Sequence, residues 1–446
     1  MAVETVPGPF SGPTAGASGP GAAASAAIKK SIKQRYAAER RFRMYGVAAI
    51  LFGLTFLAVL FASIVSTGYT AFVQSSFELN VPLDRAVIDP DGKRDQTALM
   101  TADYTLLAKK ALASAVGADP ANKVQMREIG GLLSRDVDTE IRKAVLADPA
   151  LIGKTVPIWV LASGRVDSLM KGQLDRNLPA QTRKISDQQL AWIDKLTASG
   201  ALAKRFNTGL FTNGASSNPE TAGIGVAMVG SLFMMVTVLL LAVPLGVAAA
   251  VYLQEFARKN FWTDLIEVNI NNLAAVPSIV FGLLGLAIFI NFAGLPRSAS
   301  IVGGLVLTLM TLPTIIIATR AAIGAVPPSI REAALGVGAS KMQTITHHVV
   351  PLAMPGILTG TIIGLAKALG ETAPLLMIGM VAFVVEYPTS PLAPSTALPV
   401  QIYMWATSAE RGFVERTAGA TIILLAVLIC MNLVAVILRR KYERRW

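Results

Sequence analysis

The sequence predicts an all-α integral membrane protein with six transmembrane helices and a small α+β domain inserted between the first two. Of the 446 residues, 53% are hydrophobic and only 15% are charged, whereas soluble globular proteins carry about 25% charged residues. The charges are also unevenly placed, because six apolar runs reach the length of about 20 residues that a helix needs to cross a bilayer. These runs are residues 44–72, 223–252, 268–292, 299–326, 354–384 and 417–438.

The chain begins with a leader, residues 1–43, that we expect to be disordered and basic. Residues 1–28 are mostly Ala, Gly, Pro and Ser, and such a composition cannot bury enough apolar surface to fold. A secretory signal peptide is also basic and then apolar, but its apolar core has only about 7–15 residues. Residues 44–72 are longer than that, so we interpret them as an uncleaved first transmembrane helix.

The Lys and Arg residues predict the orientation of the helices. Short loops and chain ends rich in these residues stay in the cytoplasm, and both the leader and the tail 440–446 are basic. Six crossings return the chain to the same side, so both termini are expected in the cytoplasm and residues 73–222 outside. Much of the net charge of +12 lies in basic clusters beside apolar runs, which favours lipid over nucleic acid as a partner.

Residues 73–222 resemble ordinary soluble sequence and predict a small α+β domain. Residues 76–81 alternate polar and apolar side chains as a strand does, and residues 155–161 are a second strand candidate. Helices are expected at residues 102–116, 123–147 and 186–201. Ser186 or Asp187 could cap the last of these helices.

The sequence shows no nucleotide or metal site, and we expect this chain to bind no cofactor. Gly153, Lys154 and Thr155 resemble the end of a phosphate-binding loop, but Asp148 stands where that motif needs its first glycine. The single cysteine, Cys430, lies in an apolar run, and the two histidines are adjacent without obvious partner ligands.

The loop between the fourth and fifth apolar runs, residues 329–350, predicts two short cytoplasmic helices. Ser329 and Glu332 have the spacing of a capping box, and Ser340 and Gln343 repeat it.

The small residues of this loop form a slim surface that the groove of a partner could approach closely. They are Ala333, Ala334, Gly336 and Gly338. Pro351 is expected to end the second short helix, because proline cannot continue the hydrogen-bond pattern. The alternative interpretation is a capped amphipathic loop that binds no partner.

The loop resembles the coupling loop of ABC-importer permeases, whose pattern is Glu-Ala-Ala, three residues, Gly, nine residues and Ile-x-Leu-Pro. Glu332 begins the pattern, and Gly338 stands at the matching distance. Two positions depart from it, because His348 replaces Ile and Val350 replaces Leu. In that family the loop docks into a cleft of a separate ATPase subunit. The resemblance therefore assigns ATPase coupling to Glu332, Ala333, Ala334, Gly336, Gly338 and Pro351.

Other stretches resemble the PstA family, the permease subunits of the bacterial phosphate ABC importer. Residues 366–374 are similar to the fifth helix of phosphate permeases, and residues 277–285 are similar to the third. Residues 398–403 and 439–446 are similar to PstA rather than to its companion PstC. The assignment to phosphate rests mainly on the Gly-Glu-Thr-Ala-Pro context in the first of these stretches.

The resemblance implies a fold, a function and a set of partners. Residues 223–439 would form a permease core of the type I ABC-importer kind, which moves inorganic phosphate into the cytoplasm by alternating access. The chain would be no enzyme, since ATP and magnesium would bind to partner subunits. Those partners are a PstC-like second permease subunit, a PstB-like ATPase dimer and a PstS-like periplasmic phosphate-binding protein, assembled at the bacterial inner membrane.

Three ionisable residues, Arg320, Lys367 and Glu371, interrupt the apolar runs. A charge at the bilayer centre costs about 2.5–3.5 kcal/mol on insertion scales, so such residues usually face a polar interior. Arg and Lys donate hydrogen bonds that suit a phosphate oxyanion, and a neighbouring carboxylate would keep the anion from binding too tightly. We therefore assign all three residues to the substrate pathway.

Other interpretations of these charges stay open. Arg320 lies only about 10 Å along the helix from Pro327, so its side chain could instead extend to the membrane surface. Lys367 and Glu371 are four residues apart and could form a structural pair.

The whole chain also has alternative interpretations. It could be a permease for sulfate or molybdate, or a signalling protein that uses residues 73–222 as a sensor. It could also be an ion-coupled secondary transporter with Lys367 and Glu371 as a proton relay. The coupling loop argues against a secondary transporter, which needs no such docking site.

Overall fold

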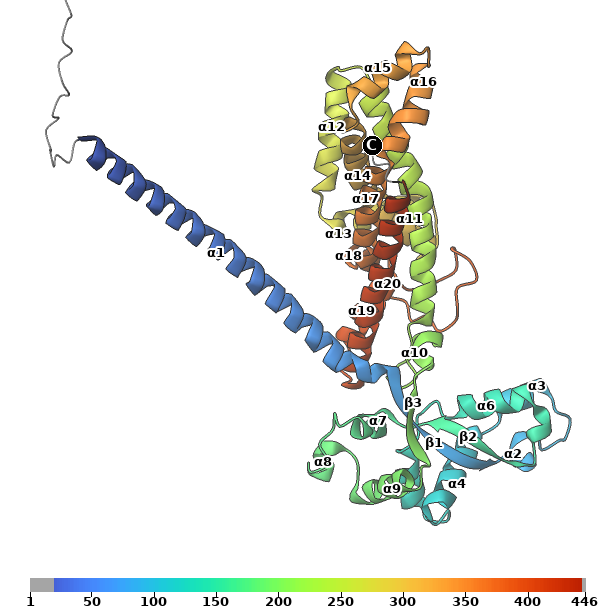
Figure 1. Ribbon diagram of the computed structural model, residues 1–446. Helices are drawn as coiled ribbons and strands as arrows, with labels where there is room; N and C mark the ends of the chain where they lie inside the picture. Colours follow the sequence, from blue (N-terminus) through green and yellow to red (C-terminus); the bar gives the residue numbers. More distant parts are fainter. Residues whose placement is uncertain (1–19, 443–446) are drawn as a thin grey trace, which may run out of the picture. The chain divides into compact units, whose positions relative to one another are not determined.

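The computed structural model describes residues 20–442, which are mostly helical (Figure 1). Residues 1–19 of the expected leader and 443–446 of the tail lie outside the described residues. In the described part, five helices are long and apolar enough to cross a membrane, and a bent helix pair makes six if it counts as one span. The five single spans are residues 35–72, 225–256, 300–324, 341–370 and 412–441. The expected six-helix architecture is confirmed, with one span in two pieces.

The chain divides into two units, residues 1–63 and 64–446. The first unit holds most of α1, Pro20–Gly68, and the second begins with the end of α1 and the 3-10 turn η1, Tyr69–Phe72. The expectation of a disordered leader is wrong for residues 20–43, which are helical. Ala, Lys and Arg dominate this segment, and all three are good helix formers.

The uninterrupted membrane helices of the second unit pack side by side, with α14 between α11 and α17, and α17 against α20 (Figure 1). They are α11 Gly225–Val251 with its π-helical end η3 Tyr252–Phe256, α14 Ser300–Gly324, α17 Val350–Gly370 and α20 Gly412–Tyr442. Small residues allow the backbones to approach closely, as in other membrane bundles. A Cβ added at Gly360 of α17 would lie 2.2 Å from Ala318 Cβ on α14.

The third apolar run, expected as one helix over residues 268–292, is broken. α12, Phe261–Ala274, meets α13, Ser278–Gly285, at an angle of 103°, and a π-helical segment η4, Leu286–Phe292, continues α13. Pro277 explains the break, because proline has no N–H to donate and disfavours a helical backbone at the residue before it. The expectation of one continuous helix over residues 268–292 is therefore wrong.

The fifth run is expected as a helix over residues 354–384, but α17 ends at Gly370. Pro374 has no N–H to donate to the carbonyl of Gly370, and a proline disfavours a helical backbone at the residue before it, so both effects favour an end of the helix here. The short α18, Ala373–Met377, and an irregular stretch follow. α19, Leu398–Ala406, then leads into α20.

The insertion domain, residues 73–222, contains a three-stranded antiparallel sheet in the order β2-β1-β3. The strands are β1 Val73–Pro82, β2 Thr155–Leu161 and β3 Leu202–Phe206. Leu79 is paired with Ile158, and Ser76 with Ala203. Both expected strands are present. β3 was not expected, because it is short and carries two basic residues where β-branched or aromatic side chains are usual.

Helices cover the sheet and complete the core of the insertion domain. They are α2 Arg85–Ile88, α3 Gln96–Thr101, α4 Tyr104–Val116, α5 Lys123–Gly130, α6 Asp138–Ala147, α7 Gly164–Met170, α8 Ala180–Arg183, α9 Asp187–Ala198 and α10 Gly209–Thr212, with a 3-10 turn η2 Pro149–Leu151. Phe77, Leu79 and Val81 are buried at alternate positions of β1. The core is closed by apolar side chains from the helices, among them Leu112 and Ile193.

The helix boundaries of this domain follow local signals in part. Ser186 caps α9, since its hydroxyl accepts from the Gln189 N–H and the Gln189 side chain accepts from the Ser186 N–H. The expected helix over residues 123–147 is instead the pair α5 and α6. Gly130 and Gly131 lie at the interruption, and glycine is among the weakest helix formers.

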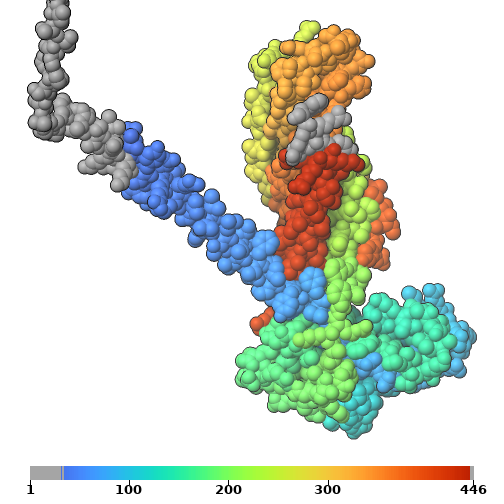
Figure 2. Space-filling view, viewed as in Figure 1, coloured from blue at the N-terminus to red at the C-terminus, as the bar shows by residue number. Residues whose placement is uncertain are grey.

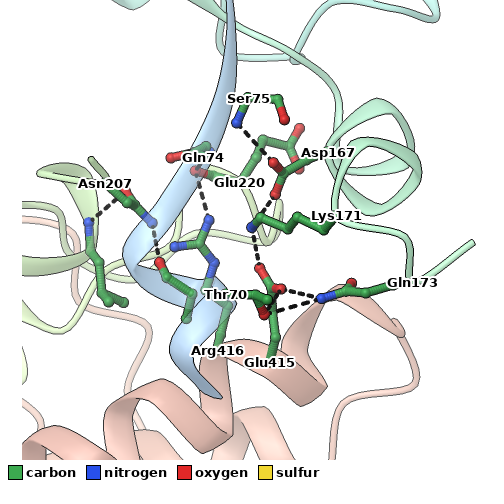
Figure 3. A network of polar contacts seen from close by, with 12 residues as sticks. Thr70, Gln74, Ser75, Asp167, Lys171, Gln173, Asn207, Glu220, Glu415 and Arg416 are labelled. Atoms are coloured by element: carbon green, nitrogen blue, oxygen red, sulfur yellow. Dashed lines mark hydrogen bonds and ion pairs between the residues drawn. The ribbon is translucent and has the colours of Figure 1, made fainter. Parts of the chain in front are cut away.

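A buried network of charged side chains joins the insertion domain to the first turn of α20 (Figure 3). Lys171 Nζ lies 2.6 Å from Asp167 Oδ2 and 2.7 Å from Glu415 Oε1, and its side chain is only 1% exposed. Thr70 and Gln173 donate hydrogen bonds to the other oxygen of Glu415. The charges are thus paired and hydrogen-bonded, which a buried ion pair requires in order to be tolerated.

Arg416 and Glu220 form the second part of this junction (Figure 3). The Arg416 side chain is buried, and its Nη2 lies 3.5 Å from the carbonyl oxygen of Glu220. Burial raises the pKa of the Glu220 carboxyl; hydrogen bonds from its own backbone N–H and from Ser134 oppose this, and the carboxylates of Glu410 and Asp136 add to it.

Replacing Lys171 by alanine should loosen the junction between the insertion domain and α20. The change leaves Asp167 and Glu415 buried without their cation, and breaking a buried pair in this way costs about 3–5 kcal/mol. The midpoint of thermal unfolding of the protein purified in detergent should fall accordingly. Lys143→Ala is the matched control, because it removes only an exposed pair with Glu140, worth about 0–1 kcal/mol. Equal midpoints for the two variants would show that the buried network stabilises the protein no more than an exposed ion pair does.

Candidate functional site

The loop with the Glu-Ala-Ala pattern and the insertion domain lie at opposite ends of the second unit. In Figure 2 the orange surface of the loop and the teal-to-green surface of the insertion domain are separated by the membrane helices. The loop holds α15, Pro328–Gly336, α16, Lys341–Gln343, and the π-helical turn η5, Thr344–Val349. Between α15 and α16, Gly338 has a φ of +89°, a left-handed conformation that glycine adopts without strain.

The residues of the motif lie mainly on the outside of this loop. Glu332, Ala333, Gly336 and Gly338 are exposed, whereas Ala334 is buried beneath them. No atom lies within 4 Å of a Cβ added at Gly336 or Gly338. The small residues of the loop are therefore accessible, as expected, and the larger side chains of Leu335 and Val337 are exposed between them.

One of the two expected capping boxes is present. Ser340 Oγ accepts from the Gln343 N–H at 3.2 Å, and Gln343 Oε1 accepts from the Ser340 N–H at 2.9 Å. The box expected from Ser329 and Glu332 is wrong, because α15 begins before Ser329 and Pro327 occupies the N-cap position.

Pro351 does not end the second short helix, contrary to expectation. Helical structure runs from Lys341 to Gly370, and Pro351 is the second residue of α17. The turn before it is widened, since the Val350 N–H bonds to the carbonyl of Ile345. Such a π-helical turn shifts the hydrogen-bond pattern and lets the chain pass a proline.

A groove of about 590 Å³ opens beside the loop. His347 and His348 line it, together with Pro351 and apolar residues such as Val326 at the end of α14. Both histidines are exposed. The imidazole that departs from the family pattern, His348, is thus at a surface that a docking partner can reach.

Arg320, expected in the substrate pathway, forms an ion pair within the membrane spans. Its Nη2 lies 2.6 Å from Oε1 of Glu267 on α12, and the two side chains are 23% and 33% exposed. Nε of Arg320 is buried and has no partner among the described residues. Glu267 was not predicted as a site residue, because it directly precedes the expected third apolar run, residues 268–292, and so does not interrupt it. The pair links α14 to the first half of the broken span.

The structure does not bring Lys367 and Glu371 together with Arg320. Gly360 of α17 packs against Ala318 of α14, so Arg320 lies level with the middle of α17 and Lys367 near its end. α17 stops before Glu371, whose backbone is extended, so the spacing of four residues no longer aligns the two side chains. In the described part of the chain, neither side chain has an ion-pair or hydrogen-bond partner.

A further basic residue of the loop, Arg331, was not expected to have a role. It forms an ion pair with Glu255 of η3, with Nη2 2.7 Å from Oε1. The two residues lie in different loops of the sequence, so no local pattern indicates their contact. Among residues 20–442, no group of three or more His, Cys, Asp or Glu side chains could hold a metal ion.

Two families match the chain. The family described as binding-protein-dependent transport system inner membrane component matches residues 242–446, which include the coupling loop and the helices from the middle of α11 onward. A domain of unknown function, DUF3333, matches residues 29–180, which include most of α1 and of the insertion domain.

Individual relatives match between about a third and a half of this chain. The probable ABC transporter permease protein YqgI of Bacillus subtilis (strain 168) is 36% identical over 166 residues, which are 37% of this chain and 56% of YqgI. The phosphate transport system permease protein PstA 1 of Mycobacterium tuberculosis (strain CDC 1551 / Oshkosh) is 34% identical over 229 residues, which are 51% of this chain and 74% of that protein.

A solved structure of the MetNI methionine ABC transporter in inward-facing conformations aligns with 49% of this chain and 97% of its own, at 16% identity and a TM-score of 0.41. At that score the likeness adds nothing to the assignment. The identity to PstA 1 over most of that protein's length, together with the helical core and the loop pattern, is sufficient to assign the family. The chain is a multi-pass inner-membrane protein and belongs to the PstA family of phosphate transport system permease proteins.

Proposed function

We propose that the chain is the membrane subunit through which an ATP-driven importer moves inorganic phosphate into the cytoplasm. The observation that carries the proposal is the exposed coupling-loop pattern, from Glu332 to Gly338, at the end of the helices opposite the insertion domain. A face of small residues, with the apolar side chains of Leu335 and Val337 exposed among them, suits docking into the cleft of an ATPase. Relatives named as phosphate transport system permease proteins support phosphate as the substrate.

The proposal includes three kinds of partner. A second permease subunit would complete the pathway, a pair of ATPase subunits would bind ATP and magnesium, and an outer binding protein would deliver phosphate. Closure of the ATPases would push on the loop and turn the pathway from inward-facing to outward-facing. Hydrolysis would reset it and release phosphate inside.

The proposed direction of transport requires the coupling loop in the cytoplasm and the insertion domain outside. The basic chain ends support this orientation. In a Cys430→Ser background, a cysteine placed at exposed Ser340 should resist an impermeant thiol reagent added to intact spheroplasts. A cysteine at exposed Asp119 in the insertion domain should react with it. Labelling of the first position from outside would invert the proposed topology.

Variants of the coupling face should uncouple the permease from its ATPase. Glu332→Lys and Gly336→Trp place a reversed charge or a large ring on the docking face. Each should lower phosphate uptake by about tenfold or more, because a charge or steric conflict in an interface costs several kcal/mol. Uptake is measured with radiolabelled phosphate in proteoliposomes that contain the whole complex. Both positions are exposed, so the amount of protein in the membrane should not change.

Lys259→Glu is the control for the coupling variants, since it reverses an exposed charge in the connection before α12 without touching the motif. It should retain uptake. If Glu332→Lys and Gly336→Trp also transported phosphate and co-purified with the ATPase at wild-type levels, the docking assignment would be wrong.

We also propose that Arg320 lies on the phosphate route, with its pairing to Glu267 as the resting arrangement. A phosphate can replace a carboxylate at a guanidinium, because both accept two parallel hydrogen bonds from its fork. The buried, unpartnered Nε of Arg320 supports the idea that the guanidinium has donors to spare. Lys367, near the end of α17, and Glu371, directly after it, remain proposed members of the same route.

Arg320→Gln should reduce uptake by about tenfold or more, as expected for the loss of charge-assisted hydrogen bonds worth about 1.5–3 kcal/mol. Arg320→Lys should fail similarly, since an ammonium cannot reproduce a two-pronged contact. The same proteoliposome assay measures both variants, with co-purification of the partners as the test of assembly. Full rescue by lysine would mean that Arg320 only extends to the membrane surface.

The uptake assay also distinguishes the alternative functions. Excess sulfate or molybdate that abolishes phosphate uptake, and is itself taken up faster, would favour a permease for another oxyanion. Uptake that is driven by a proton gradient and persists without ATP would favour a secondary transporter.

A further inference from the structure

The coupling loop is held to the ends of two membrane helices through the side chain of Arg331 on α15. Its Nε and Nη2 donate to Glu255 Oε1 at 3.2 and 2.7 Å. Its Nη1 donates to the carbonyl of Val326 at 2.7 Å, and Nη2 also donates to the carbonyl of Ile323 at 2.9 Å. One guanidinium therefore connects α15 with η3, the end of α11, and with the end of α14.

The chemistry of these contacts explains why the residue is an arginine. The last carbonyls of a helix have no partner within it, and a cation near them is favoured by the helix dipole. Arg331 supplies both a charge and donors to the end of α14, and Glu255 balances the charge. The two side chains are only 22% and 10% exposed, so solvent and salt screen the contact less than they screen a surface pair.

A second contact joins the other short helix of the loop to the same turn. Lys341 Nζ of α16 lies 5.0 Å from the centre of the Phe256 ring, within the range of a cation–π interaction. Glu255 and Phe256 are neighbours in η3. Both short helices of the loop therefore contact one turn at the end of α11.

Behind these contacts, α11 and α14 form a tightly packed pair. A Cβ added at Gly246 of α11 would lie 2.8 Å from Cγ2 of Ile315 on α14, and one added at Gly304 of α14 would lie 2.5 Å from Thr237 Cβ on α11. Such interfaces have no free volume to absorb a displacement, because packed cores are not continuously deformable. Whatever displaces the end of one helix also displaces the other.

We propose that Arg331 is a positioning residue that transmits movement of the coupling loop into the α11–α14 pair. The inference rests on the proposed function, since it assumes that an ATPase moves the loop. Without the Arg331 guanidinium, the ATPase can still displace the loop, but the displacement no longer moves α11 and α14 as a pair. ATP is then hydrolysed without transport.

The test compares Arg331→Gln, Arg331→Lys and Glu255→Gln in the complete complex reconstituted in proteoliposomes. Phosphate taken up per ATP hydrolysed should fall about tenfold in both Arg331 variants, within the range by which coupling residues act. ATP hydrolysis itself should persist. Arg331→Lys should not rescue, because an ammonium has its donors on one nitrogen, whereas the guanidinium reaches the carboxylate and the two carbonyls from three separate nitrogens. Glu255→Gln should have a smaller effect, since the two carbonyl contacts remain.

Two comparisons separate transmission from mere stability. Combining Arg331→Gln with Glu255→Gln should be no worse than Arg331→Gln alone, because the two residues act through one contact. Arg258→Gln is the matched control: this exposed arginine lies in the connection after η3 and should leave the ratio unchanged. A wild-type ratio in Arg331→Gln, or a parallel loss of hydrolysis and partner co-purification, would overturn the inference.

A readout that does not depend on phosphate separates this inference from the proposed function. Hydrogen–deuterium exchange of residues 252–256 should change when ATP is added to the wild-type complex and should not change in Arg331→Gln. If the wild-type complex moved no phosphate, the proposed function would fail while this exchange experiment still decided the role of Arg331. An identical ATP response in wild type and Arg331→Gln would refute the inference.

Discussion

Hydrocarbon offers no water to a polypeptide backbone, so each membrane span must satisfy its own hydrogen bonds. The continuous helices α11, α14 and α17 largely meet this constraint, although each contains a proline. At two other prolines the helical pattern is interrupted. Pro277 breaks the third span, and Pro374 stops α17. A Cβ added at Gly282 of α13 would lie 2.7 Å from Cα of Pro374, so the two interruptions are packed together. Irregular backbone at membrane depth is tolerated where protein buries it or where it lines a cavity.

Ion pairs join segments that the chain keeps far apart. Arg320 and Glu267 hold the broken span to α14, and Lys171 binds the insertion domain to α20 through Glu415. Arg331 joins the coupling loop to η3 through its ion pair with Glu255. In each case one partner lies at a helix end, at a break in a helix or at a junction between elements. Backbone polar groups without helical partners occur at such places and can accept or balance a charge. These three ion pairs therefore lie where elements of the chain meet.

Features that depend on neighbouring residues could be predicted from the sequence, whereas contacts between distant residues could not. Apolar runs and the spacing from Glu332 to Gly338 are local, and they predicted the spans, the two strands and the exposed loop. The run around Pro277 was predicted as one helix, because average hydropathy does not register one absent donor, and the structure divides it in two. Glu267 pairs with Arg320 across 53 positions, a distance that no sequence pattern encodes. The assignment of Lys367 and Glu371 to the pathway stays a prediction.

The strand order β2-β1-β3 sets the order of events when the chain is made. The central strand, β1, comes first in the sequence, and both of its neighbours come later, at residues 155–161 and 202–206. Pairings this distant in sequence form slowly, and until they form, β1 has two open edges, which are prone to join other chains. A nascent chain of this protein therefore needs its first strand shielded until almost the whole insertion domain has been synthesised.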